Sequence, residues 1–109
     1  MYLMNWKTPV EGGKWKSPHR VDIPFVWDNV DKSQETVGTG HELQPLADKM
    51  SGAWIAFAHT GNPSTRTLKW PAYTVSDRAT MIFDNKCEVV HDPGKEERIA
   101  VSRTLNLPG

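Results

Sequence analysis

The chain has 109 residues, 38% of them hydrophobic, which suits one folding unit with a modest core. Its 13 basic and 13 acidic residues give a formal net charge of zero, and there is no basic run. The electrostatic attraction that gathers nucleic acid or an anionic membrane surface is therefore missing. No apolar run approaches the roughly 20 residues that a membrane span requires. We expect a globular protein that binds neither nucleic acid nor membrane.

The single cysteine, Cys87, excludes an internal disulfide and a cysteine-based zinc cluster. We expect it to be a packed, inert thiol on a strand, because free cysteine is among the most buried residue types. The first residues, MYLMNWKTPVEGG, lack the charged start and apolar core of a signal peptide. These features are compatible with a cytoplasmic protein, although a fragment of any mature protein would look the same.

The first expected elements are a strand, a loop and a short helix. The apolar, aromatic run at 2–6 ends at the proline and glycines of KTPVEGG, which predicts a strand over 2–6 and a loop over 7–22. We predict a helix over 23–30 with Pro24 in its first turn, where a missing N–H is tolerated. Its apolar residues recur at the spacing of one helical face, at Ile23, Val26, Trp27 and Val30. A polar, glycine-containing loop follows.

The clearest expected element is a long amphipathic helix over 42–60. Pro45 must lie in its first turn, and Gly61 followed by Pro63 supplies the left-handed cap and the stop typical of a helix C-terminus. We interpret its apolar stripe as core and not as a cofactor site. The stripe keeps to a 3.6-residue period and consists of Leu43, Leu46, Ala47, Met50, Trp54, Phe57 and Ala58.

Residues 61–79 are expected to be irregular, and the apolar runs on either side of DNK predict a β-hairpin over 80–90. In the tail, 91–109, Asp92 and Pro93 are expected at the cap and first turn of a last short helix. No repeat or linker divides the chain. The pattern therefore predicts a single α/β unit, 1–109, dominated by one long helix.

The chain lacks the local signatures of most catalytic and cofactor sites. None of its six serines lies in a Gly-x-Ser-x-Gly nucleophile elbow, and there is neither a glycine-rich phosphate loop nor a His-Glu-x-x-His zinc motif. His41, His59 and His91 are too widely spread for a local metal site. The acids of KEER and VSD are expected to be solvated charges. We therefore expect no metal and no cofactor.

His19 is the histidine whose setting suits catalysis. Acyl transfer by a serine needs a base with a pKa near the working pH, held on a loop that can reach the nucleophile. In α/β-hydrolases the catalytic serine, acid and histidine follow in that chain order, so the histidine comes late. The order of strand, loop, His19 and short helix fits this pattern. On spacing alone, an ordinary loop histidine is the better explanation.

The stretch HRVDIPFVWDN resembles the histidine motif of type-B carboxylesterases, which include para-nitrobenzyl esterases and cholinesterases, of the form H-x-x-E-[IL]-x-F-V-F. Asp22 replaces the usual glutamate and Trp27 the usual phenylalanine. The segments LADKMSGAWIAFAHTGNPS, WPAYTVSDRATMIFD and CEVVHDPGKEER resemble the family's long C-terminal helix, its Trp-Pro-x-Tyr segment with the following strand, and its closing hairpin. The resemblance runs from about Tyr2 to Arg98 in unbroken order.

This resemblance implies that the chain is the C-terminal segment of an α/β-hydrolase, with YLMNW as the last main strand of the sheet. It implies that His19 is the general base of a Ser-Asp/Glu-His triad that hydrolyses carboxylic esters, and that Asp22 braces the loop or caps the following helix. The family's serine elbow, oxyanion-hole glycines and triad acid belong to upstream sequence. The chain alone is then expected to be inactive, with an ester substrate only in the complete enzyme.

Three interpretations compete. The first is a C-terminal portion of a type-B carboxylesterase that contributes His19 when joined to an upstream portion. The second is a non-catalytic module that self-associates or binds a partner through an exposed apolar face. The third is an independent enzyme of another class that uses His19 or Cys87. Activity restored by the upstream portion favours the first, and serine-independent turnover lost in His19→Ala or Cys87→Ala favours the third.

Overall fold

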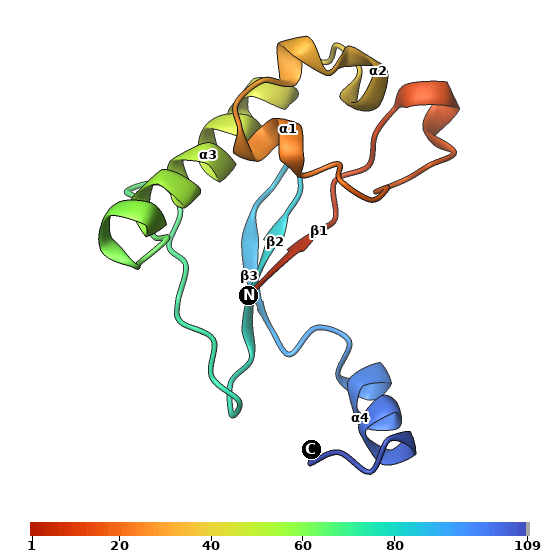
Figure 1. Ribbon diagram of the computed structural model, residues 1–109, viewed down its shortest axis with the longest axis vertical. Helices are drawn as coiled ribbons and strands as arrows, with labels where there is room; N and C mark the ends of the chain where they lie inside the picture. The colour runs from red at the N-terminus through yellow and green to blue at the C-terminus, as the bar shows by residue number, and fades with distance from the viewer. Residues whose placement is uncertain (109) are drawn as a thin grey trace.

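The computed structural model describes residues 1–108, so residue 109, the end of the predicted tail, lies outside the described residues. A three-stranded sheet occupies the centre (Figure 1). Strand β1 (Tyr2–Met4) runs parallel to β2 (Ala79–Phe83), and β2 is antiparallel to β3 (Glu88–His91). Because β2 is the middle strand, the beginning and the end of the chain share one sheet.

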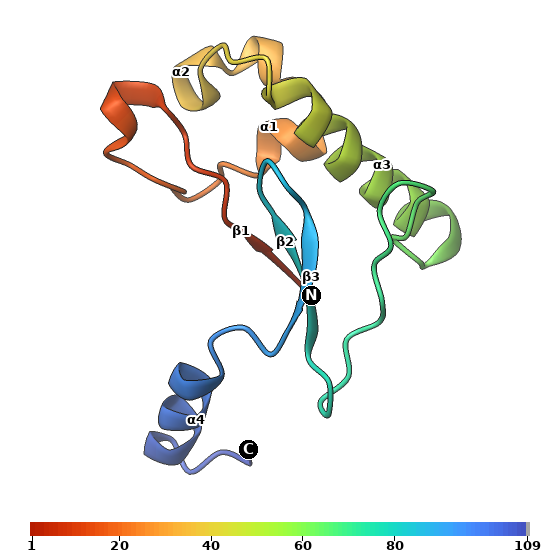
Figure 2. The same ribbon diagram turned by 180° about the vertical axis from the view of Figure 1, so that it is seen from behind.

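Helix α3 (Leu43–Thr60) lies along one side of the sheet in both views (Figures 1 and 2). It forms where the apolar period predicted a long helix, with Pro45 in its first turn. Gly61 ends it in the left-handed conformation, φ 76°, and donates its N–H to the Phe57 carbonyl at 2.8 Å. The predicted stripe is only partly core, because Phe57 and Ala58 are exposed. The buried residues of α3 are Leu43, Leu46, Ala47, Met50 and Ala53.

The helix predicted over 23–30 is much shorter. Helix α1 (Ile23–Val26) ends after one turn, and Asp28 has a φ of 52° that no α-helix continues. The predicted apolar face is correct only in part. Ile23 and Trp27 are 45% and 74% exposed, whereas Val30 is buried and Phe25, outside that face, is completely buried. A single turn contains too few residues for a period to define a face, and contact with neighbouring elements decides which side chain is covered.

The polar segment after α1 was expected to be a loop, but it contains two short helical turns. They are η2 (Val30–Lys32) and α2 (Gln34–Val37). Val37 is completely buried and Val30 nearly so. These two valines therefore attach the polar stretch to the core. Because they are isolated in the sequence, they form no periodic pattern from which the helical turns could be predicted.

A hairpin forms where one was predicted, with β2 and β3 paired from Ala79 opposite His91 to Ile82 opposite Glu88. Helix α4 (Lys95–Thr104) then extends away from the sheet and buries no side chain (Figure 1). Its expected cap is wrong. Gly94, at φ 70°, occupies the cap position, so Pro93 precedes the helix and does not lie in its first turn. The Asp92 carboxylate accepts hydrogen bonds from the Arg98 guanidinium and none from helix amides.

Aromatic side chains from four segments fill the space between α3 and the sheet. Their ring centroids lie 5.0–6.3 Å apart, mostly in edge-to-face geometry. We call this set the aromatic cluster; it consists of Tyr2 on β1, Trp54 on α3, Trp70 in the irregular segment and Phe83 on β2. Aromatic pairs of this kind add about 0.5–1.5 kcal/mol each beyond the area they bury. The cluster joins the strand that precedes His19 to the long helix.

Candidate functional site

The loop that carries His19, residues 7–22, leaves the sheet at the carboxyl end of β1. The amides of Asn5 and Trp6 both donate to the Phe83 carbonyl, at 2.8 and 3.1 Å, which carries the pairing past β1. Because β1 and β2 are parallel, their carboxyl ends lie at the same edge of the sheet. In open α/β sheets, ligands bind outside the carboxyl ends of the strands. The loop thus begins at the edge where such a fold performs chemistry.

The first half of this loop is closed on itself. The Thr8 amide donates to the Lys16 carbonyl at 2.9 Å, and the Thr8 hydroxyl donates to the Thr36 carbonyl at 2.7 Å. Between Thr8 and Lys16 lies the 3-10 turn η1 (Val10–Gly13), which includes Gly12 at a φ of 70°. This closed stretch therefore ends at Lys16, and the residues that follow Lys16 lie next to the sheet again.

His19 is exposed, and contacts to β1 flank it on both sides. Before it, the Ser17 hydroxyl donates to the Met4 carbonyl at 3.1 Å. After it, the Tyr2 hydroxyl donates to the Asp22 carboxylate at 2.7 Å. Among residues 1–108 the imidazole itself makes no hydrogen bond. The segment around His19 is therefore attached to β1 through Ser17 and Asp22, while the His19 ring nitrogens stay open to other groups.

Asp22 contacts the sheet through its side chain and starts α1 only through its backbone. Its carbonyl accepts the amides of Phe25 and Val26 at 3.1 and 3.0 Å, but its carboxylate makes no capping hydrogen bond. The helix-capping role expected for this side chain is therefore wrong. Burial, followed by the hydrogen bond to Asp22, raises the pKa of Tyr2 to about 12, so the tyrosine remains a neutral donor.

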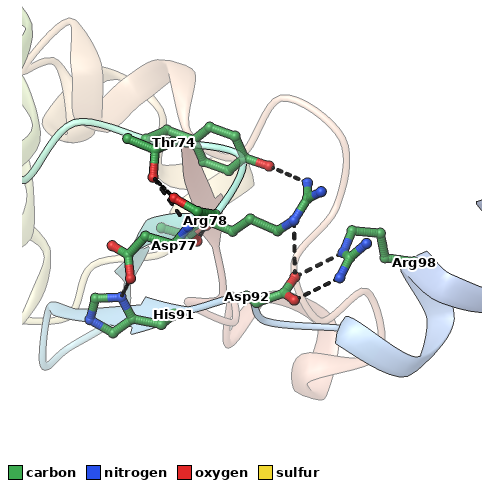
Figure 3. A network of polar contacts seen from close by, with 9 residues as sticks. Thr74, Asp77, Arg78, His91, Asp92 and Arg98 are labelled. Atoms are coloured by element: carbon green, nitrogen blue, oxygen red, sulfur yellow. Dashed lines mark hydrogen bonds and ion pairs between the residues drawn. The ribbon is translucent and has the colours of Figure 1, made fainter. Parts of the chain in front are cut away.

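The structure does not bring the other candidate residues to His19. His41 precedes α3 and His59 lies in its last turn, and His91 places Nδ1 2.8 Å from Asp77 Oδ1 at the far end of the hairpin (Figure 3). Cys87 lies one residue before β3, not on a strand as expected, and its thiol is half-buried against the Asp84 carbonyl at 3.5 Å.

Within the described residues, 1–108, no three His, Cys, Asp or Glu side chains form a group that could hold a metal ion. No helix in that range is long and apolar enough to cross a membrane. A cavity of about 930 Å³ does open beside α3, lined mainly by aromatic and apolar side chains that include Trp54, Phe57 and Trp70. No residue of the His19 loop lines it.

The pairing of Tyr2 with Asp22 and that of Asp77 with His91 had no signal in the sequence. Their members lie 20 and 14 residues apart, and neither pair belongs to a local motif. Only the fold brings them together.

Comparison with known proteins decides the family, since the model of the carboxylesterase family matches residues 1–102. The chain belongs to the carboxylesterase family. It is 36% identical over 100 residues to para-nitrobenzyl esterase of Bacillus subtilis (strain 168), covering 90% of this chain and 20% of that protein. It is 28% identical over 110 residues to phenmedipham hydrolase of Pseudarthrobacter oxydans, covering 95% of this chain and 22% of that protein.

Solved carboxylesterase structures superpose on the same segment. A thermophilic PNB esterase has a TM-score of 0.82 at 34% identity, over 91% of this chain and 21% of that chain. A carboxylesterase of Geobacillus stearothermophilus at pH 6.2 has a TM-score of 0.76 at 36% identity, over 92% of this chain and 21% of that chain. The predicted α/β-hydrolase class and the type-B carboxylesterase resemblance are confirmed. This carboxylesterase chain spans about one fifth of the length of these relatives.

Proposed function

We propose that this chain is the C-terminal segment of a serine carboxylesterase and supplies its general base, His19. During ester hydrolysis His19 takes the proton of the attacking serine and then protonates the leaving alcohol. It finally activates water against the acyl-enzyme. The observation that carries the proposal is the position of His19, which is exposed near the carboxyl end of β1 between two residues, Ser17 and Asp22, whose side chains hydrogen bond to that strand.

The open imidazole supports this role. A triad histidine uses one ring nitrogen for the serine and the other for the acid that orients it. The His19 ring makes no hydrogen bond within residues 1–108, so both nitrogens are available to groups from elsewhere. Asp22 is occupied by Tyr2 and serves to brace the loop, not to complete the triad.

The remaining machinery must come from outside these 109 residues. The sequence contains no serine elbow, and the relatives are about five times longer, so most of an esterase domain is left to supply the serine, the oxyanion hole and the triad acid. We therefore expect the isolated chain to have no esterase activity. Its substrate, a carboxylic ester, would be bound only by the complete domain.

A second candidate function is a non-catalytic module that self-associates or binds a partner. The observation that favours it is the apolar wall of the cavity beside α3, to which Phe57 contributes although 56% of its surface is exposed. Contiguous surfaces of this kind mark interaction sites in many soluble proteins. The first proposal also accounts for this surface, because a segment that is normally covered by the rest of a hydrolase domain exposes apolar side chains when it is alone.

The test is hydrolysis of p-nitrophenyl acetate by the pure chain, with and without the upstream portion of para-nitrobenzyl esterase. Activity should arise only in the mixture and fall by about 10³-fold or more in His19→Ala, since loss of a triad member leaves only residual catalysis. His59→Ala is the matched control, because it removes an exposed histidine from α3. An inactive mixture combined with a stable oligomer of the pure chain would favour the interaction module instead.

A further inference from the structure

The Tyr2 side chain connects β1 to the end of the His19 loop. Its hydroxyl donates to the Asp22 carboxylate at 2.7 Å, a short hydrogen bond of the kind expected when the acceptor is charged. The bond closes a stretch of 20 residues. The pKa of Tyr2, raised from 10.0 to about 12 mainly by burial, lies far above physiological pH, so the hydroxyl is present as a donor.

The ring of Tyr2 is fixed by the aromatic cluster. Its centroid lies 5.0 Å from that of Trp54, 5.8 Å from that of Phe83 and 6.3 Å from that of Trp70. These neighbours belong to α3, β2 and the irregular segment, so the ring is contacted from three separate parts of the fold. The hydroxyl is therefore a donor with a fixed position, anchored in the core and directed at the loop.

The chain between His19 and Asp22 is short and internally bonded, so a constraint on Asp22 reaches His19. The Val21 amide donates to the Pro18 carbonyl at 3.2 Å, and the Ile23 amide donates to the Arg20 carbonyl at 3.2 Å. Val21 is only 2% exposed and holds the same turn to the core. These overlapping turns leave the backbone of His19 little freedom as long as Asp22 stays in place.

We infer that Tyr2 is a positioning residue for His19, acting through Asp22. The inference rests on the proposed function of His19 as general base. Positioning matters because a misplacement of about 1 Å in a catalytic group can lower the rate about 10²-fold. The Ser17 contact to Met4 holds the loop from the other side, so loss of the Tyr2 hydroxyl should loosen His19 without releasing the loop completely.

The first experiment needs no activity. The His19 imidazole is followed by NMR in the 109-residue chain, in the unchanged protein and in Tyr2→Phe, Asp22→Ala and the double variant. Tyr2→Phe keeps the ring and its packing and removes only the hydroxyl. Both single variants should shift the His19 ring signals and increase their mobility, and the double variant should add nothing, since coupled residues are non-additive. Tyr73→Phe is the matched control, because it removes a hydroxyl that accepts from Arg78 instead.

The second experiment measures kcat and KM in the mixture with the upstream esterase portion. Tyr2→Phe should lower kcat about 10-fold to 100-fold with KM nearly unchanged, the pattern of lost alignment. Should Tyr2→Phe lose its secondary structure, Asp22→Ala provides the same comparison. Unchanged His19 signals in Tyr2→Phe and Asp22→Ala would overturn the inference, even where His19→Ala abolishes activity. A different result would be altered His19 signals in Tyr2→Phe and Asp22→Ala together with full activity of the mixture that contains His19→Ala. In that case the proposed function is wrong, and Tyr2 positions a residue without a catalytic role.

Discussion

The indole of Trp6 meets the ring of Phe25 edge to face, with the ring centroids 5.0 Å apart and both side chains buried. Trp6 follows β1 at the start of the His19 loop, and Phe25 lies in α1, directly after that loop. The contact therefore joins the two ends of the loop inside the core. The Tyr2–Asp22 hydrogen bond and this aromatic pair hold the same loop by different means, one polar and one apolar.

Trp6→Ala should destabilise the chain severely, because it removes a fully buried aromatic side chain and leaves a cavity under the loop. The expected decrease in the free energy of unfolding is about 3–5 kcal/mol. It is measured by urea denaturation followed by near-ultraviolet circular dichroism. Trp27→Ala removes the same side chain from a site that is 74% exposed and should change stability by only about 0.5 kcal/mol. Equal effects of the two substitutions would contradict the assigned burial.

Gly61→Ala should destabilise α3 because residue 61 ends the helix with a φ of 76°. A residue with a Cβ in the left-handed conformation costs roughly 1–2 kcal/mol, although no atom lies within 4 Å of the added methyl group. Gly52→Ala is the opposite case. It lies in the middle of α3 with Thr65 Cγ2 at 4.0 Å from the new Cβ, and should stabilise the chain by roughly 0.5–1 kcal/mol. Thermal unfolding of both variants measures the difference, and a shift of the same sign in both would contradict the assigned conformations.

The sequence predicted elements well where many residues repeat one pattern. Helix α3 has several turns of apolar period, a proline allowed only in the first turn and a glycine at its end, so its bounds were correct to within one residue. The hairpin had two apolar strands around a polar turn. By contrast, α1 has a single turn, and its buried aromatic residue, Phe25, was missed because no period can be read over four residues.

Side-chain contacts between distant residues could not be predicted from local patterns. Asp92 stands where a helix cap is expected, yet its carboxylate accepts two charge-assisted hydrogen bonds from Arg98, six residues later. His19 was distinguished by its resemblance to a family motif, since its spacing after a strand was ordinary. The hydrogen bond from Tyr2 to Asp22 depends on where the loop returns to the sheet, which only the folded chain determines.

The raised pKa of Tyr2 predicts a loss of stability in alkaline solution. The pKa is about 12 in the folded chain and near its ordinary value of 10.0 when unfolded, mainly because folding buries the hydroxyl. The contribution is therefore complete below about pH 10 and is lost as the pH rises toward 12, where the unfolded chain has already ionised. Tyr2→Phe should show a smaller decline of the unfolding free energy over this range than the unchanged chain. Identical declines in the two proteins would mean that Tyr2 does not titrate as its environment indicates.

The ion pair between Asp92 and Arg98 is expected to be the main contact that holds α4 to the end of β3. The carboxylate accepts from Arg98 Nε and Nη2 at 3.0 and 2.8 Å, and Arg78 Nε lies 4.0 Å away, whereas α4 itself buries no side chain (Figure 3). Asp92→Asn removes the charge while keeping a side chain that tolerates the φ of 51° at this position. We expect faster hydrogen exchange of the α4 amides with β2 and β3 unchanged.

Acid should have the same effect on α4 as Asp92→Asn. The hydrogen bond from Arg98 lowers the pKa of Asp92 below its ordinary value of 3.8, so the stabilisation is present above about pH 4 and is lost as the pH falls through the lowered pKa. The protection of the α4 amides, taken as their exchange rate relative to that of an unstructured chain at the same pH, should therefore decrease in acid in the unchanged chain but not further in Asp92→Asn. Asp31→Asn is the matched control, because Asp31 pairs with the neighbouring, exposed Lys32 at 3.4 Å and lies in η2, not near the start of α4. If α4 exchanges at the same rate in Asp92→Asn and in the unchanged chain at neutral pH, contacts other than this ion pair must hold the helix.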